Sequence, residues 1–358
     1  MTSDHKKASR RPDRNITRLL DWVSTSPGQH LIVADENWIN VPWSQIAVDK
    51  KSQFFIVSNR YDIARHARHA GLITSFNDLN FDDFPEHSFD SVLFRVSKER
   101  ASSHHVINQA TRLLKQKGRL VLSGGKNDGI KSYIKSACQR LGNHAAADKD
   151  GNSYLSEIRF LQDNLSPLDD NNYGQLRPIE DSSLKMMTKP GIFGWNKVDR
   201  GSAFLSDCIT AFSSRFMTSP NSLLDLGCGY GYLANQARNL SLEHITLTDN
   251  NAAALAAATL NFKHSALDIS IVASDAGDII QRQFDTIWCN PPFHQGFSVD
   301  GDMSSKFLVN TKRLLSPKGR ALFVVNAFIP LADRAQKYFA SVHEIGNNGS
   351  FKVIALGH

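Results

Sequence analysis

The residues best suited to chemistry stand together in the run Asn290-Pro291-Pro292-Phe293. An amino group on an aromatic ring, or an amide nitrogen, is a poor nucleophile because its lone pair is delocalised. If the Asn290 side-chain oxygen and the Pro291 carbonyl accept its hydrogens, the nitrogen can pyramidalise and attack an electrophile. Pro292 keeps this turn rigid, and Phe293 offers a ring face on which a base can stack, worth about 1–3 kcal/mol. The run predicts catalysis by positioning and electrostatics, without a strong base.

A second run, Asp225-Leu226-Gly227-Cys228-Gly229-Tyr230-Gly231, has the pattern of a strand that ends in a tight turn before a helix. Glycine is needed where the backbone takes positive φ or where a ligand approaches the main chain. The dinucleotide fingerprint requires another glycine at position 232, where this chain has tyrosine. The run instead resembles the cofactor motif of S-adenosylmethionine (SAM)-dependent methyltransferases. That resemblance implies that Gly227, Gly229 and Gly231 hold the methionine and ribose parts of SAM, while Asp225 supports the loop.

Two further carboxylates are expected at the ends of the next strands. Asp249 follows the glycine loop by about 20 residues, the spacing at which an acidic residue accepts hydrogen bonds from ribose hydroxyls. Asp275 is placed for the adenine amino group, and it fits equally well as a helix N-cap. Ligands of parallel α/β sheets bind beyond the carboxyl ends of the strands, so these residues and Asn290 predict a single site.

The elements that position this site alternate between strand and helix through the second half of the chain. The strands are expected at 244–248, 269–273, 284–289 and 320–325, and a closing hairpin at 342–345 and 351–355. Helices are expected at 251–262, 304–315 and 331–340. Such alternation is typical of a parallel sheet covered by helices.

The first half repeats this rhythm without a glycine loop. Strands are expected at 31–34, 54–57, 91–94 and 119–122, and the segment after the first of them is Asp35-Glu36-Asn37-Trp38. Residues 89–94 parallel 284–289, and 112–119 parallel 313–320, which aligns Arg95 with Asn290. We interpret this as an internal duplication whose first copy lost its chemistry; chance similarity of two strand–helix–strand units is the alternative.

Composition bounds the remaining choices. The 358 residues are 41% hydrophobic and 21% charged, with a net charge of +6, which suits a soluble two-domain protein able to bind a polyanion. No membrane span or signal peptide is evident, and the four cysteines are scattered, so we expect a cytoplasmic protein with reduced thiols and no metal site. The expected organisation is a basic polar arm at 1–18, a domain at 19–162, a linker at 163–183 and a catalytic domain at 184–358.

The segment 189–202 resembles the P-G-V-F-S-x-x-x-x-D-x-G-S segment of the small-subunit ribosomal RNA guanine-N2 methyltransferases (RsmC type) and their large-subunit relatives. The runs at 290–294, 325–330 and 351–353 are also similar to that family. The resemblance implies two tandem Rossmann-like class I methyltransferase domains, the first lacking the cofactor loop and contributing to RNA binding. It further implies that Phe193, Asp199 and Gly201 close over SAM; Gly194 departs from the family's serine.

The leading hypothesis is therefore SAM-dependent methylation of a guanine N2 in 16S ribosomal RNA, acting as a monomer within the small subunit. The alternatives are a guanine N2 of 23S ribosomal RNA, an adenine N6, a protein glutamine, or a non-catalytic RNA-assembly factor that binds SAM. Candidate contacts to the RNA backbone in the first domain are Arg60, Arg65, Arg68, Arg95, Lys98 and Arg100.

Overall fold

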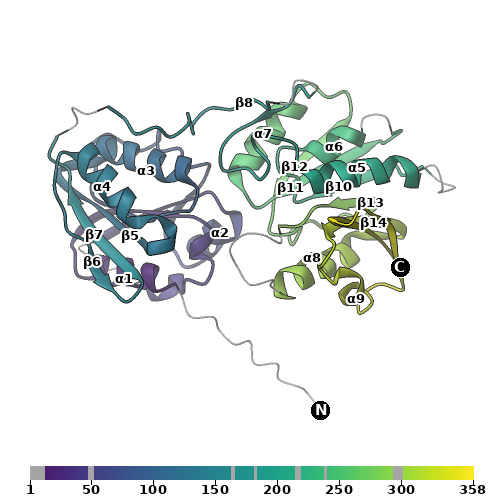
Figure 1. Ribbon diagram of the computed structural model, residues 1–358, viewed down its shortest axis with the longest axis horizontal. Helices are drawn as coiled ribbons and strands as arrows, with labels where there is room; N and C mark the ends of the chain where they lie inside the picture. The colour runs from purple at the N-terminus through teal and green to yellow at the C-terminus, as the bar shows by residue number, and fades with distance from the viewer. Residues whose placement is uncertain are drawn as a thin grey trace, which may run out of the picture. The chain divides into compact units, whose positions relative to one another are not determined.

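The computed structural model describes residues 13–46, 52–162, 166–180, 184–213, 219–237, 240–292 and 301–358. The chain forms two compact units, Met1–Gly174 and Gln175–His358, and each is considered by itself (Figure 1). No helix in the described ranges is long and apolar enough to cross a bilayer.

The second unit is built on a seven-stranded sheet in the order β12-β11-β10-β13-β14-β16-β15. The first five strands of this order run parallel, and β16 runs antiparallel to both of its neighbours, β14 and β15. The strands are β10 (Ser222–Leu226), β11 (His244–Asp249), β12 (Asp268–Ala273), β13 (Phe284–Cys289), β14 (Leu315–Asn326), β15 (Ser341–Asn347) and β16 (Phe351–Gly357). The reversal on either side of β10 places the carboxyl ends of β10 and β13 at a topological switch point, where α/β sheets bind ligands.

Successive side chains of the buried strands point to opposite faces of the sheet, and both faces are apolar, so helices cover both of them. Leu223 belongs to the core beneath α5 (Arg200–Ser213), α6 (Tyr232–Gln236) and α7 (Ala252–Phe262). Leu224, the next residue, belongs to the opposite core beneath α8 (Gly301–Leu314) and α9 (Leu331–Ala335) (Figure 1). A short hairpin, β8 (Arg177–Pro178) and β9 (Met187–Thr188), precedes these elements.

The first unit repeats this architecture, with its sheet in the order β3-β2-β1-β4-β5-β7-β6. The strands are β1 (Gly28–Ala34), β2 (Ser52–Ser58), β3 (Ile73–Phe76), β4 (Phe89–Arg95), β5 (Leu114–Gly125), β6 (Asp148–Asp150) and β7 (Ser153–Arg159). The helices are α1 (Arg14–Ser24), α2 (Tyr61–His69), α3 (Arg100–Leu113) and α4 (Ile130–Leu141), with short 3-10 turns at Glu36–Trp38, Trp43–Gln45 and Lys126–Asp128. The predicted pair of tandem Rossmann-like domains is confirmed, and the strand orders correspond one to one.

Strand register identifies what replaced the cofactor loop in the first unit. His30 lies opposite Ser91 as Leu223 lies opposite Thr286. Counting along β1 then aligns Ile32 with Asp225, and Ile32 is fully buried in an apolar core. The first copy therefore lacks the glycines, as the sequence predicted, and it also lacks the carboxylate.

Two boundaries differ from the sequence prediction. The polar arm was expected to reach residue 18, but α1 begins at Arg14 because the Asp13 side chain caps it by accepting a 2.9 Å hydrogen bond from the Asn15 amide. Within the linker expected at 163–183, the described residues are attached to the units on either side. Tyr173 is fully buried and donates to Asp78, whereas Arg177–Pro178 pairs with β9.

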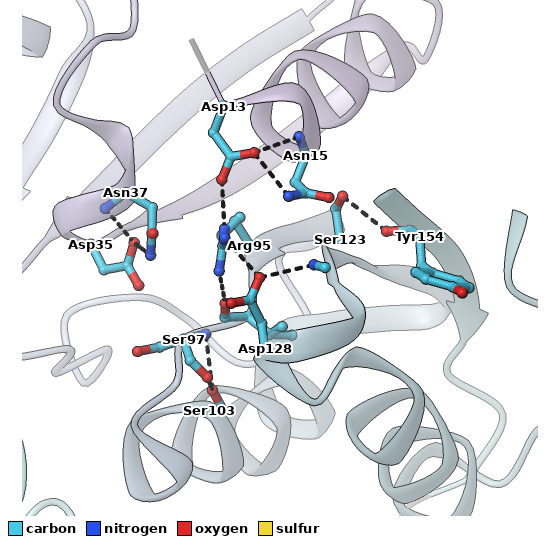
Figure 2. Close-up of polar contacts among 12 residues, drawn as sticks. Asp13, Asn15, Asp35, Asn37, Arg95, Ser97, Ser103, Ser123, Asp128 and Tyr154 are labelled. Atoms are coloured by element: carbon cyan, nitrogen blue, oxygen red, sulfur yellow. Dashed lines mark hydrogen bonds and ion pairs between the residues drawn. The ribbon is translucent and has the colours of Figure 1, made fainter. Parts of the chain in front are cut away.

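At the carboxyl ends of β4 and β5, the first unit holds a buried charge cluster (Figure 2). Arg95 Nε donates to Asp13 Oδ2 at 2.9 Å, and Arg95 Nη2 pairs with Asp128 Oδ2 at 2.8 Å. Only 10% of the arginine side chain is exposed. Arg95 is therefore not available to hold RNA backbone, contrary to its place among the predicted contacts.

Removing this arginine is expected to destabilise the first unit. Arg95→Ala leaves the Asp13 and Asp128 carboxylates in a largely buried place without their cation, and breaking such a pair costs about 3–5 kcal/mol. Arg14→Ala is the matched control, because the Arg14–Asp150 pair is exposed and such pairs contribute less than about 1 kcal/mol. Chemical denaturation measures both; an equal, small loss in the two variants would contradict the assignment.

Candidate functional site

The site is assembled at the carboxyl ends of β10, β11 and β13 and at the first turn of α5. Asn290 directly follows β13 and is half-buried. Its Nδ2 donates to Asp199 Oδ2 at 2.7 Å and to Ser202 Oγ at 2.8 Å. The Ser202 amide also donates to Asp199 Oδ2, at 2.8 Å, so Asp199 caps α5 while it holds Asn290. Pro291 is buried and Pro292 exposed; Phe293 lies outside the described residues.

The glycine loop connects β10 to α6 and is held by β11. The amides of Gly227 and Cys228 donate to the Thr248 carbonyl, and the Gly229 amide donates to Asp249 Oδ2 at 2.9 Å. Gly229 has φ +55°, and a Cβ built there would meet no described atom closer than 4.0 Å. Gly231 has φ +89°, and its Cβ would lie 2.6 Å from the Phe262 ring. Gly229 thus leaves open space above the loop, whereas Gly231 permits close packing beneath it.

Asp225 is a buried carboxylate directly behind the loop. Its Oδ2 accepts a hydrogen bond from the Ala234 amide at 2.9 Å, which attaches the first turn of α6 to β10. Oδ1 is buried and has no hydrogen-bond partner among the described residues. Burial raises the pKa of Asp225 to about 7, with a further contribution from the Asp249 charge and an opposing one from the Ala234 hydrogen bond. The sequence placed Asp225 as a support of the loop, and the structure shows this contact.

Asp249 and the segment before α5 enclose the loop from the other side. Asp249 Oδ1 accepts from the Asn251 amide at 2.9 Å, and Asn251 Nδ2 donates to the Gly191 carbonyl at 2.8 Å. The Ile192 side chain is the described group nearest the open space at Gly229. The segment that resembles the methyltransferase family is therefore beside the glycine loop. Phe193 in this segment is 58% exposed.

The remaining predicted residues have other contacts. Asp275 pairs through Oδ2 with Lys306 of α8. Its amide donates to Asp278 Oδ1 at 3.0 Å, and a turn follows it in place of the helix that an N-cap would begin. Gly201 lies in the first turn of α5, where a Cβ would meet the Phe351 ring at 3.1 Å and Asp199 Oδ2 at 3.0 Å. Asn290, Asp199 and Gly201 are thus brought together, and Asp225, Gly229 and Asp249 form an adjoining group.

Sequence reasoning missed three residues of this network, namely Ser202, Asn251 and Lys306. Ser202 belongs to the D-x-G-S part of the family segment, so a signal for it was present. Asn251 caps α7 by accepting from the Ala253 amide, and an asparagine before an alanine-rich helix is a recognisable N-cap. Lys306 carried no local signal, because its partner Asp275 is distant in the sequence.

The residues of this site fit SAM. Open space above Gly229 gives a ligand access to the main chain, because no described protein atom lies closer than 4.0 Å to the position of a Cβ there. Asp225 Oδ1 is an orphaned buried acceptor at the same loop, suited to a cationic or hydrogen-bond-donating group. Asp249 presents a carboxylate at the neighbouring strand end. Together these supply acceptors for a ligand that carries an ammonium group and ribose hydroxyls.

Comparison with known proteins gives a consistent result. Residues 183–355 match the family model of the methyltransferase small domain. The ribosomal RNA small subunit methyltransferase C of Shewanella amazonensis is 26% identical over 275 residues, 75% of this chain and 78% of that protein. Its namesake from Pseudomonas aeruginosa is 28% identical over 266 residues, covering 74% and 77% of the two chains.

A solved structure agrees in fold along nearly the whole chain. It is the T. thermophilus 16S rRNA N2 methyltransferase in complex with AdoMet and guanosine, with a TM-score of 0.81 and 20% identity. The match covers 96% of this chain and 92% of that chain, so it includes both Rossmann-like units.

Two glycine substitutions should separate binding from packing. In Gly229→Ala the new methyl group enters the open space above the loop, so SAM affinity should fall by about 100-fold or more, equivalent to about 2.7 kcal/mol. In Gly231→Ala the methyl group collides with Phe262, so the second unit should lose about 1–3 kcal/mol of stability. Calorimetry and thermal unfolding measure the two effects; unchanged SAM affinity in Gly229→Ala would refute the cofactor assignment.

Asp225 should make the second unit less stable as pH rises. Its pKa is raised to about 7 in the folded protein from an ordinary value of 3.8, so between these pH values the folded state holds a proton that the unfolded state has lost. The free energy of unfolding therefore falls by about 1.4 kcal/mol per pH unit on account of this group and levels off above pH 7. Asp225→Asn should remove that slope.

The slope is measurable by hydrogen exchange of the β10 and β13 amides at pH 5, 6 and 7 in the protein without SAM. Asp207→Asn, an exposed substitution on α5, is the control and should keep the slope. An Asp225→Asn protein with the same pH dependence as the wild type would show that Asp225 is ionised throughout this range.

Proposed function

We propose that this chain, which is similar to the small-subunit ribosomal RNA methyltransferases C, transfers a methyl group from SAM to the exocyclic N2 of a guanine in 16S ribosomal RNA. The observation that carries this proposal is the amide of Asn290. Both hydrogens of its nitrogen are directed at Asp199 and Ser202, beside a glycine loop with open space above it. An amide held in this way presents its oxygen as an acceptor to a substrate group that donates hydrogen bonds, such as an amino group.

When bound, SAM supplies an electrophilic methyl group on a sulfonium sulfur, and the transfer leaves S-adenosylhomocysteine and one proton. Gly229, Asp225 and Asp249 are the residues that would hold it. The Asn290 oxygen and the Pro291 carbonyl accept the two hydrogens of the guanine amino group, which localises the nitrogen lone pair. The nitrogen loses its proton after it has gained positive charge, so no strong base is required. Orientation and fixed dipoles therefore lower the barrier.

The guanine must leave a base stack to reach Asn290, at a cost of a few kcal/mol if it is paired. We propose that the first unit contributes to holding the surrounding RNA. Among its predicted contacts, Arg68, Lys98 and Arg100 are exposed, whereas Arg60 is half-buried near Glu36. The same proposal includes the assembled small subunit as substrate, a monomeric enzyme and a cytoplasmic location. The net charge of +6 suits the nucleic-acid part of that substrate.

Asn290→Ala should abolish transfer while leaving SAM bound. Loss of the acceptor oxygen removes hydrogen bonds to the developing charge, which costs about 100- to 1000-fold in rate. SAM affinity should stay within about tenfold of wild type, or about 1.4 kcal/mol. The measurement is nucleoside mass spectrometry after incubation with isotopically labelled SAM and, separately, unmodified small subunits, large subunits and free ribosomal RNAs.

Labelled N2-methylguanosine in 16S RNA from the wild type, and its loss in the variant, would support the proposal. Label in 23S RNA alone would move the substrate to the large subunit. If no RNA acquired label while SAM binding was intact, methylation of ribosomal RNA would be refuted.

A further inference from the structure

We propose that Asp199, together with Ser202, is a positioning residue that sets which end of the Asn290 amide faces the methyl acceptor. This inference rests on the proposed function, since it concerns how the same site recognises an amino group. Family resemblance implied instead that Asp199 closes over the cofactor. In the structure, the carboxylate of Asp199 is directed at two groups of the protein itself, the Asn290 nitrogen and the Ser202 amide.

The hydrogen-bonding capacity of these groups determines the orientation. A carboxylate can only accept, so the side of Asn290 that faces Asp199 must be its NH2 group. That group has two hydrogens, and the structure provides two acceptors, Asp199 Oδ2 at 2.7 Å and Ser202 Oγ at 2.8 Å. Within the described part of the chain, no hydrogen bond reaches Asn290 Oδ1. The amide nitrogen is thus saturated, and its oxygen keeps both lone pairs for a ligand.

The reversed amide is excluded by charge. Rotating the Asn290 side chain by half a turn would place its oxygen against the Asp199 carboxylate, so two acceptors would meet without a hydrogen between them. Asp199 is itself held, because the same oxygen accepts the Ser202 amide at the first turn of α5. The orientation of Asn290 therefore depends on where α5 begins.

The first unit contains an equivalent contact between a strand end and a helix-capping carboxylate, but its donor, Arg95, has no acceptor to offer a substrate. Asp13 caps α1 as Asp199 caps α5. Arg95 is the last residue of β4, and the repeat aligns it with Asn290, which directly follows β13. Arg95 donates to Asp13 at 2.9 Å. The acidic cap and its donor have thus been kept in both copies. A guanidinium has no acceptor, however, so the first copy retains the contact and exposes no oxygen to a substrate.

The orientation of the Asn290 amide also restricts the class of substrate. With its oxygen presented, the site recognises an atom that carries hydrogens, such as an amino group, and repels a carbonyl oxygen, which would meet it as a second acceptor. On guanine this favours N2 over O6. Asp199 therefore contributes to selectivity without contacting the reacting atoms.

Asp199→Asn tests this role, because asparagine caps a helix about as well as aspartate and the fold should be kept. An asparagine can face Asn290 with either its oxygen or its NH2 group, so the fixed orientation is lost. We expect kcat at saturating SAM to fall about 10- to 100-fold, with the Kd for SAM within about twofold of wild type. Ser202→Ala keeps the carboxylate and should lower kcat less. Asp207→Asn, on the exposed side of α5, should leave both values unchanged.

A second measurement is independent of the methyl acceptor. In the wild type, both Nδ2 hydrogens of Asn290 are hydrogen-bonded, so its side-chain amide resonance, assigned through Asn290→Ala, should exchange slowly with solvent and exchange faster in Asp199→Asn. If wild type labels no ribosomal RNA, the proposed function fails while this resonance still decides the inference.

The inference is overturned by either of two results. One is an Asp199→Asn enzyme with wild-type kcat and weakened SAM binding, which would return Asp199 to the cofactor. The other is an Asn290 side-chain amide that exchanges equally fast in wild type and variant.

Discussion

The hydrogen bond from Asn290 to Asp199 connects the end of β13 to the start of α5, and the chemistry that we propose for the second unit depends on it. The two residues are far apart in sequence, and only the parallel sheet brings a strand end and a helix start to the same edge. The bond fixes an amide that would otherwise rotate, and the proline pair that follows limits the main chain beside it. Rigid placement of acceptors is what methyl transfer to an amino group requires when no strong base is present.

The repeated fold shows how few side chains distinguish a unit that has such a site from one that does not. Both units keep the strand order, the helical cover and an acidic cap on the first helix. The first unit has Ile32 where the second has Asp225, and an arginine where the second has Asn290. Arg95 pairs with Asp13 and Asp128, so the position that holds the Asn290 amide in one copy belongs to an internal ion-pair cluster in the other. Stability and chemistry are thus alternative uses of one place in the fold.

Much of this could be predicted from local patterns. The alternation of strands and helices, the glycine loop and the internal repeat gave the fold class and the edge at which Gly229, Asp249 and Asn290 lie. The short β3, and the strands β6 and β7, were not predicted because they lack a clear alternation or lie in polar sequence. The roles of Asp199 and Lys306 could not be obtained either, since each depends on a partner distant in sequence. The start of helix α1 was not predicted because Arg14 and Arg18 were assigned to the basic arm at 1–18. The cap at Asp13 and the ion pairs of these two arginines with β6 contribute to holding the helix.

The most direct test of the account is a crystal structure of this protein with SAM and guanosine. In that complex the guanine N2 should lie within hydrogen-bonding distance, about 2.7–3.2 Å, of both Asn290 Oδ1 and the Pro291 carbonyl. Asp199 should still accept from Asn290 Nδ2 in that complex. A guanine bound with its N2 away from Asn290, or an Asp199 that has left the amide for the cofactor, would contradict it.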